Sequence, residues 1–203
     1  PFSQSDLKRR LELYRKRMDP TKINIGKIVT RPKNILIVKQ MMEHIYKGYR
    51  SGLISMATGT GKTRVAMALI DVLLRANIVR NVLFIADRIA LANQAKSAGF
   101  KEFFSEAVVD LRENPESFPN GLYVSTVQTL RSGKQKKCFE KFSPGFFDLI
   151  IFDEAHRSIY DPNRLIYKYF DAIKLGLTAT PSSAESRNTF ELFDCDGERA
   201  TIE

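Results

Sequence analysis

The sequence predicts an α/β fold in which a parallel β-sheet is covered by helices on both faces. Short apolar runs without polar alternation recur along the chain, among them residues 81–86, 122–125 and 147–152. Such runs are typical of strands that are buried on both faces. Amphipathic helical patterns separate them, as the crossover connections of parallel strands require. A glycine-rich segment between a strand and a helix, at residues 55–63, is a third sign of this fold class.

The composition indicates one globular domain. The chain has 203 residues, of which 43% are hydrophobic, and this is enough for a core. No apolar run approaches the roughly 18 residues of a membrane span. Cys138 and Cys195 are isolated, which disfavours a disulfide framework or a zinc site and favours a reducing, cytoplasmic compartment. Because the chain starts at Pro1 without an initiator Met, we expect it to be a piece of a longer protein.

The positive charge is concentrated in the first quarter of the chain. Residues 1–50 contain 13 Lys and Arg against 4 Asp and Glu, whereas residues 51–203 contain 19 of each sign. A basic segment attracts nucleic acid, but a solvated helix face explains such a run equally well. The sequence leaves both interpretations open.

The first quarter is expected to contain two helices. Residues 3–18 form the first, with Leu7, Leu11 and Tyr14 (or Leu13) on its apolar side, and Asp19-Pro20 ends it. A linker over residues 20–32 leads to a second helix from about Asn34 to Tyr49, and then to the apolar pair before the glycine-rich segment.

The remaining elements follow the same alternation. Helices are expected over residues 89–98, 127–131 and 163–170, and further strands near residues 107–109 and 174–177. Beyond Pro181 the chain turns polar, which predicts a loop or tail.

The glycine-rich segment has the pattern of a phosphate-binding loop. It reads Ser-Met-Ala-Thr-Gly-Thr-Gly-Lys-Thr over residues 55–63. Gly59 and Gly61 allow the backbone N–H groups to turn inward, beside the positive end of the following helix. We expect Lys62 to reach the β- and γ-phosphates and Thr63 to bind Mg²⁺. Thr58 and Thr60 complete the cofactor-binding loop, in which Met56 replaces the first glycine of the general pattern.

A pair of carboxylates provides the second half of the expected site. Asp153 and Glu154 follow four apolar residues, at the predicted carboxyl end of a strand, where open α/β proteins bind ligands. Asp153 can bind Mg²⁺ through oxygen and water. Glu154 can orient or deprotonate the water that attacks the γ-phosphate. Together with the loop, this pair predicts a nucleoside-triphosphate hydrolase.

These residues resemble the motifs of superfamily 2 helicases and translocases. Residues 57–63 resemble motif I, Asp-Glu-Ala-His at 153–156 resembles motif II, and Leu-Thr-Ala-Thr-Pro at 177–181 resembles motif III. Residues 84–88, with Leu91 and Gln94, resemble motif Ia, and residues 124–130 resemble a later DNA-contacting motif. The resemblance covers about residues 31–181 in the same order and implies a RecA-like P-loop fold of three layers.

Three stretches are similar to the motor (R) subunit of type I restriction enzymes. They are Asp-Glu-Ala-His-Arg-Ser-Ile-Tyr at residues 153–160, residues 169–172 and residues 175–181. This resemblance implies a nuclease domain upstream, to which residues 1–30 would connect, and lobe 1 over residues 31–185. Residues 186–203 would be the tail towards a second lobe. It also implies ATP and Mg²⁺ as cofactors, double-stranded DNA as partner, and separate methylation and specificity subunits.

The resemblance also assigns roles to single residues. His156 would link the nucleotide site to its surroundings, and Thr178, Ala179 and Thr180 would relay the state of the γ-phosphate. Gln40 lies 22 positions before Lys62, a separation similar to that of the adenine-reading glutamine. Because Lys39 stands where the family has an aromatic residue, an exposed helical Gln is an equal alternative.

Arg88 and Thr126 are the expected contacts to the phosphate backbone of DNA, and such contacts carry no sequence information. No second-lobe motif follows Pro181, so the arginine finger is absent and the 203 residues alone are expected to hydrolyse ATP very slowly. Two alternatives remain open. One is another superfamily 2 enzyme, such as an RNA helicase or repair translocase, and the other is a nucleotide-gated DNA-binding module without turnover.

Overall fold

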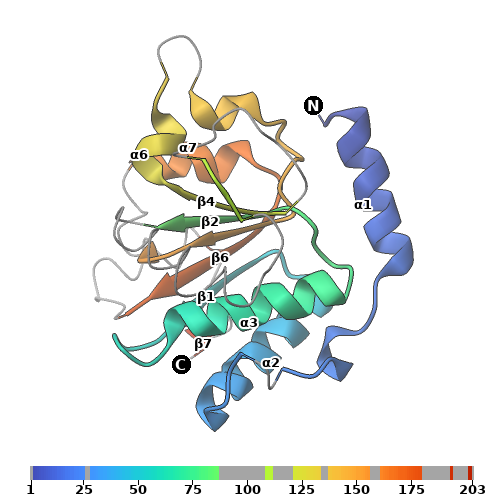
Figure 1. The fold of residues 1–203 in the computed structure, drawn as a ribbon, viewed down its shortest axis with the longest axis vertical. Coiled ribbons are helices and arrows are strands. Elements are labelled where there is room, and N and C mark those ends of the chain that lie inside the picture. The colour runs from blue at the N-terminus through green and yellow to red at the C-terminus, as the bar shows by residue number, and fades with distance from the viewer. Residues whose placement is uncertain are drawn as a thin grey trace.

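The described residues include seven strands, which form one parallel sheet at the centre of the fold (Figure 1). The computed structural model describes residues 2–25, 28–86, 108–111, 121–133, 137–155, 161–179, 193 and 201–202. The strand order is β3-β4-β2-β5-β6-β1-β7, and each neighbouring pair is parallel. The strands are β1 (Ser51–Ser55), β2 (Val82–Ala86), β3 (Val108–Asp110), β4 (Leu122–Thr126), β5 (Leu149–Phe152), β6 (Ile173–Thr178) and β7 (Thr201–Ile202). The predicted fold class is confirmed.

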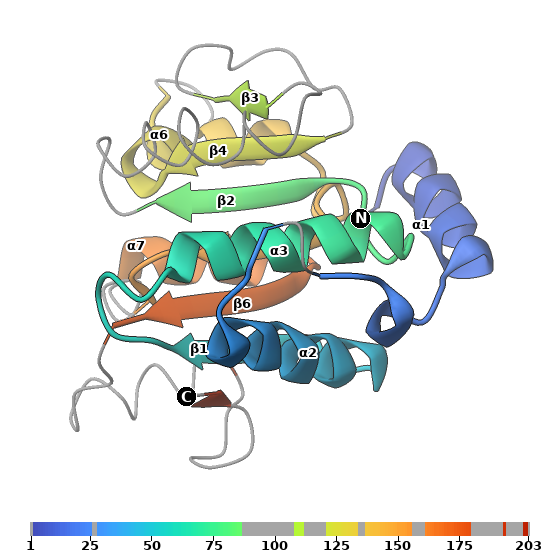
Figure 2. The same ribbon diagram turned by 60° about the horizontal axis from the view of Figure 1, so that its bottom comes forward.

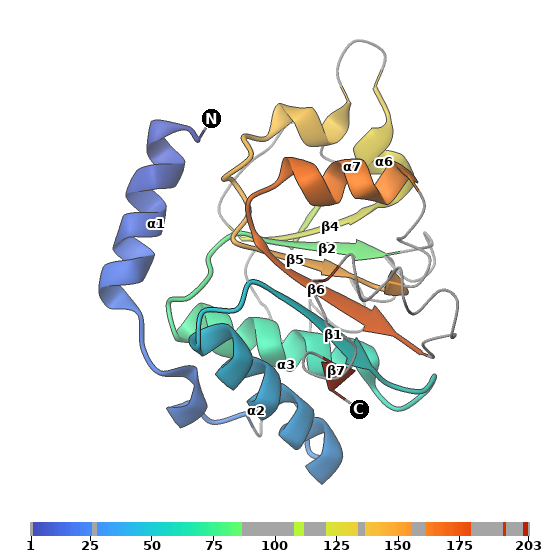
Figure 3. The same ribbon diagram turned by 180° about the vertical axis from the view of Figure 1, so that it is seen from behind.

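Helices cover both faces of this sheet (Figures 1 and 3). One face carries α2 (Pro32–Tyr46) and α3 (Lys62–Arg75), whose apolar sides share a core with strand residues such as Phe84 and Ile151. The other face carries α6 (Val127–Arg131), η3 (Cys138–Lys141) and α7 (Asp161–Tyr169) over a second core rich in aromatic rings. Strands β2, β4 and β5 are buried along their whole length, which explains their continuous apolar sequence.

Strand β6 lies between the strand that precedes the glycine-rich loop and the strand that ends at the carboxylate pair (Figure 3). Ser55 at the end of β1 is in register with Thr178, and Phe152 at the end of β5 is in register with Gly176. Parallel strands place their carboxyl ends at one edge of a sheet. The two predicted halves of the site therefore meet across β6.

Helix α1 (Gln4–Lys16) lies at the opposite edge, beside the amino ends of the strands (Figures 1 and 2). It starts with a capping box between Ser3 and Asp6. The expected apolar side is wrong for Leu7, Leu11 and Tyr14, which are 53%, 50% and 75% exposed. Leu13, the alternative to Tyr14, is buried as expected, and the other buried residues of the helix are the charged Asp6 and Arg9.

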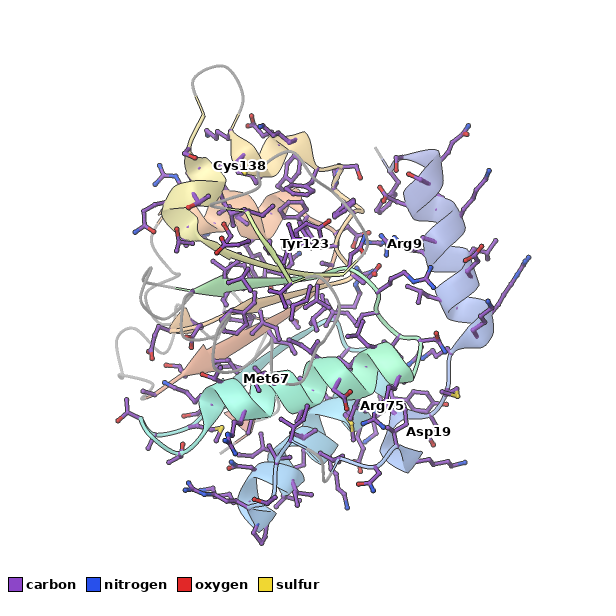
Figure 4. The ribbon with its side chains drawn as sticks, in the orientation of Figure 1. Arg9, Asp19, Met67, Arg75, Tyr123 and Cys138 are labelled. Carbon is purple, nitrogen blue, oxygen red and sulfur yellow. The ribbon has the colours of Figure 1, made fainter. Side chains whose placement is uncertain are left out.

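Hydrogen bonds and ion pairs, rather than apolar burial, account for this orientation of α1. The Arg9 guanidinium reaches from the helix to the sheet (Figure 4), where it pairs with Asp148 and donates to the carbonyl oxygens of Gly145 and Phe146, both at 2.8 Å. Arg10 donates to the Phe147 carbonyl at 3.1 Å. Apolar periodicity contains no information on such contacts.

Other boundaries differ in smaller ways. Between α1 and α2, η1 (Pro20–Lys22) occupies part of the expected linker. Helix α2 starts at Pro32 rather than Asn34 and ends before Tyr49, whose ring stacks on His44. The predicted loop or tail beyond Pro181 is wrong at β7, which pairs with Leu53 and Ile54 of β1, and Phe193 is fully buried. The expected helix over residues 89–98 lies outside the described residues. None of the described helices has the length and hydropathy needed to span a membrane.

Candidate functional site

The glycine-rich loop connects β1 to α3 with the backbone geometry that its sequence predicts. Gly59 and Gly61 both have positive φ angles, of 76° and 103°, which a residue without a Cβ adopts readily. The loop is closed by Thr60, whose hydroxyl donates to the carbonyl of Ala57 at 2.6 Å. Gly61 is the N-cap of α3 and has no side chain to cap it. The first N–H groups of this 14-residue helix are therefore available to an anion.

Strand β6 fixes the start of the loop. The Met56 N–H donates to the carbonyl of Thr178 at 2.9 Å, at the end of β6. Thr178 itself is buried, and Ala179 is half-buried. Thr178 thus lies directly beside the loop, and Ala179 follows it in the chain. The third residue expected to relay the γ-phosphate state, Thr180, lies outside the described residues.

The carboxylate pair follows β5 in a tight turn. The Asp153 N–H donates to the Ile85 carbonyl at 2.9 Å, and the Glu154 N–H donates to Oδ1 of Asp153 at 3.1 Å. Glu154 has a φ of 52°, a left-handed conformation that is uncommon for a residue other than glycine. Such conformations cost about 1–3 kcal/mol and cluster at functional sites.

An ion pair joins the two halves of the site. Nζ of Lys62 donates to Oε1 of Glu154 at 2.9 Å. The side chains are 11% and 21% exposed, so the pair is largely shielded from water. The residues lie 92 positions apart in the sequence, and the strand order brings them together.

Asn34 is a site residue that the sequence did not indicate. Its Nδ2 donates to the Thr60 carbonyl at 3.2 Å, and the residue is 93% buried, with 7% exposed. A hollow of about 240 Å³ beside it is lined by Lys33, Asn34, Ser55, Met56, Ala57 and Thr60. Asn34 lies two residues after Pro32, at the start of a helix. The sequence does not indicate its role in the site, because a single buried polar residue does not alter an amphipathic pattern.

Gln40 lies six residues after Asn34 on the same helix, and its side chain is exposed. The structure therefore brings Asn34, rather than Gln40, against the loop. Reading of adenine by Gln40 stays a prediction.

The expected metal ligands are Thr63, in the first turn of α3, and Asp153, and both are half-buried. A hydroxyl and a carboxylate are oxygen donors, which suit Mg²⁺ when phosphate and water supply the remaining ligands. Among the described residues there is no group of three or more His, Cys, Asp or Glu that could hold a metal by itself. The donor set thus fits a magnesium ion that binds together with a nucleotide.

The expected DNA contacts are only partly described. Thr126 is 1% exposed, and its hydroxyl caps α6 by accepting from the Thr129 N–H at 3.2 Å. In this conformation the hydroxyl does not face solvent, so its contact with DNA stays a prediction. Arg88, His156 and the lysines 134 and 136 lie outside the described residues.

This combination of fold and site defines a class of protein. A parallel sheet with a phosphate-binding loop after β1 and an acidic pair after β5 is the architecture of a helicase-like ATPase domain of RecA-like fold. The comparisons with known proteins specify the family.

Residues 27–183 match the family described as "Type III restriction enzyme, res subunit". The chain belongs to this family, and it is an HsdR-like lobe of the superfamily 2 helicases. The type I restriction enzyme EcoAI endonuclease subunit of Escherichia coli is 31% identical over 161 residues, which cover 77% of this chain and 20% of that protein.

Two solved structures resemble the chain. A fragment of a putative HsdR subunit of a type I restriction enzyme from Vibrio vulnificus YJ016 has a TM-score of 0.68 and 25% identity, covering 91% of this chain and 32% of that one. The Hef helicase domain of Pyrococcus furiosus has a TM-score of 0.61 and 24% identity, covering 76% and 36%, which shows the fold alone. The chain spans about a fifth of the length of the EcoAI subunit.

Proposed function

We propose that this chain is the ATP-binding motor lobe of a DNA translocase, the R subunit of a type I restriction enzyme. In this proposal ATP hydrolysis drives movement along double-stranded DNA. The observation that carries it is the 2.9 Å ion pair between Lys62 and Glu154. This pair places a phosphate-binding cation and a candidate water-activating carboxylate within one site, as a hydrolase requires.

The residues of the chain divide the work as follows. The N–H groups of the loop and of the first turn of α3 bind the β- and γ-phosphates, and Lys62 adds a positive charge. Thr63 and Asp153 would hold Mg²⁺, which neutralises charge on the phosphates when it is bound. Glu154 orients the attacking water and accepts its proton.

Coupling to DNA would start at β6. Because the Met56 N–H is bonded to the Thr178 carbonyl, a shift of the loop on nucleotide binding acts directly on the end of this strand. We propose that Thr178 and Ala179, with Thr180 and His156, transmit this shift. Arg88 and Thr126 would contact the DNA backbone, and Gln40 would read the adenine.

Further parts of the enzyme complete the proposal. Residues 1–30 would connect to a nuclease domain, residues 31–185 form the first motor lobe, and residues 186–203 lead to a second lobe. Methylation and specificity subunits would assemble with it in the cytoplasm. Without an arginine from a second lobe, these 203 residues would bind nucleotide and hydrolyse it slowly, because such a finger is worth about 10³–10⁵ in rate.

The proposal is tested by ATP hydrolysis in the full-length protein, assembled with its partner subunits, with and without long duplex DNA. We expect duplex DNA to stimulate hydrolysis in the wild type and to have no effect in Lys62→Ala. Stimulation by single strands or RNA instead would contradict translocation on duplex DNA. An absence of hydrolysis under all conditions would favour a nucleotide-gated binding module.

A further inference from the structure

We propose that the outer faces of α1 and α2 form a second DNA-contacting surface, which binds the phosphate backbone without sequence specificity. This basic face consists of the exposed cations Lys8, Arg15, Lys16, Lys22, Arg31, Lys39 and Lys47. Its residues belong to α1, to η1 and to α2 with its two caps, and these elements lie along the outside of the lobe (Figures 1 and 2). The basic face is separate from the carboxyl ends of the strands, where Thr126 lies.

The cations of the basic face have no ion-pair partner among the described residues. The described salt bridges of residues 2–50 use Arg9, Arg10 and Arg50, which hold α1 and the start of β1 to Asp148 and Asp171. By contrast, the exposed cation Arg75 on α3 pairs with Asp71 one turn away. Apart from the charge interaction of Lys22 with Asp19, the described residues therefore leave the charge of the basic face unpaired.

Few carboxylates share this surface. Asp6 is buried, and its Oδ2 accepts hydrogen bonds from the Ser143 hydroxyl and from the Ser3 N–H. Asp19 lies beside Lys22 and accepts from the Thr21 N–H at 3.0 Å. Glu12 and Glu43 are the exposed acidic residues of the described part of residues 2–50. Seven cations against three carboxylates, Glu12, Asp19 and Glu43, produce a local field that attracts a polyanion.

The positions on each helix favour an extended ligand. Lys8 and Arg15 lie two turns apart on one side of α1, away from the buried Arg9 and Leu13. Lys39 lies on the exposed side of α2, and the exposed Lys47 is the C-cap of that helix. Helix α1 is about 20 Å long, a length over which a DNA duplex carries about 12 phosphates. A row of cations at this spacing matches a nucleic-acid backbone better than a single small anion.

Duplex DNA is the ligand that this arrangement fits. The basic face and the proposed motor function would bind the same ligand, but DNA binding by the basic face does not depend on ATP hydrolysis. A surface of this kind would bind DNA outside the hydrolytic site and keep the lobe bound to the duplex between translocation steps. The exposed apolar residues Leu7, Leu11 and Tyr14 lie beside the cations on α1, so a protein partner is the competing occupant of that helix.

The test uses the full-length protein and a labelled duplex of random sequence. The variant Lys8→Gln/Arg15→Gln/Lys39→Gln/Lys47→Gln removes four charges and retains helix-forming side chains. We expect the slope of log K against log salt to fall by about 3 to 4, because each lost phosphate contact removes about 0.9. Hydrolysis without DNA should be unchanged. The control is Arg164→Gln/Lys168→Gln, which removes exposed cations from α7 on the other face of the sheet.

The outcomes separate this surface from the motor function. An unchanged slope in the four-fold variant overturns the basic face, even if duplex DNA still stimulates hydrolysis. Loss of assembly with another protein, at an unchanged slope, also overturns it and assigns α1 to protein docking. A decrease of about 2 in the α7 control, which is the same change for each charge removed, would show a general charge effect and would likewise contradict the proposal.

Discussion

Lys62 and Glu154 form a partly buried ion pair in which the ammonium that should bind phosphate is held by the carboxylate that should activate water. A nucleotide must compete with Glu154 for this ammonium. We expect Glu154→Gln to bind ATP at least as tightly as the wild type, because the competing charge is removed. Hydrolysis should fall by about 10²-fold or more, since the general base is lost.

Fluorescent-nucleotide titration and steady-state hydrolysis measure the two effects. Glu43→Gln, on the exposed side of α2, is the matched control and should change neither quantity. Weaker nucleotide binding by Glu154→Gln would show that the carboxylate supports the bound state instead of competing with it.

Asn34 supports the phosphate loop through the carbonyl of Thr60. Asn34→Ala removes one neutral hydrogen bond, worth about 0.5–1.5 kcal/mol, so nucleotide affinity should fall about 2- to 10-fold. Gln40→Ala on the same helix is the comparison. If Gln40 reads the base, its variant changes the preference for ATP over GTP, whereas Asn34→Ala weakens both equally. An unaltered affinity in Asn34→Ala would remove the residue from the site.

Arg9 neutralises Asp148 at the amino end of the sheet. Oδ2 of Asp148 also accepts from the N–H groups of Arg80 and Asn81, both at 2.9 Å. Arg9→Met leaves this buried carboxylate with Arg10 alone, whose Nε lies 3.8 Å from Oδ1 of Asp148, and should lower the free energy of unfolding by about 2 kcal/mol. Urea denaturation measures the loss, and the neighbouring exposed Lys8→Met should change it by less than about 0.5 kcal/mol. Equal effects of the two substitutions would show that the ion pair contributes little.

Gly176 allows β6 to pack closely between its neighbours. A Cβ at this position would lie 2.7 Å from Cδ1 of Leu53 and 2.9 Å from both Cβ of Ala155 and Cε2 of Phe193. Gly176→Ala should therefore cost about 1–3 kcal/mol through overpacking. Because Ala155 follows Glu154, the shift should also reduce hydrolysis at saturating ATP. Thermal unfolding and turnover test both effects, and a stable, fully active variant would contradict this packing argument.

Because Tyr123 is buried, we expect the free energy of unfolding to decrease at alkaline pH. Burial of its phenol raises the pKa well above the ordinary value of 10.0. The unfolded chain therefore releases this proton at a lower pH than the folded chain does. The contribution of Tyr123 is full below about pH 10 and is lost as the pH rises further. Tyr123→Phe should flatten the decline of unfolding free energy between pH 9 and pH 11. An unchanged slope would assign the decline to other groups.

The parallel sheet, the loop and the carboxylate pair could be predicted because each depends on local sequence. Gly59, Gly61 and Lys62 are adjacent, and Asp153 directly follows its strand. The strand order then determines that Lys62 and Glu154 meet. Local sequence pattern is sufficient to predict a site where the fold class fixes how its parts are arranged in space.

The docking of α1 and the role of Asn34 could not be predicted in the same way. The buried side of α1 is set by Arg9 and by a carboxylate 139 residues away, and no periodicity reports such a pair. Asn34 is buried because the loop of another segment supplies its acceptor. Both contacts are polar and join residues far apart in the sequence, so they can be recognised only in the folded structure.

The two residues of β7 cover part of the edge of β1. By pairing with Leu53 and Ile54, they cover the backbone N–H and C=O groups that β1 would otherwise present to solvent along the sheet edge. An uncovered edge of this apolar strand is a template for pairing with other chains. A protein shortened before Thr201 should therefore self-associate through β1, next to its own nucleotide loop.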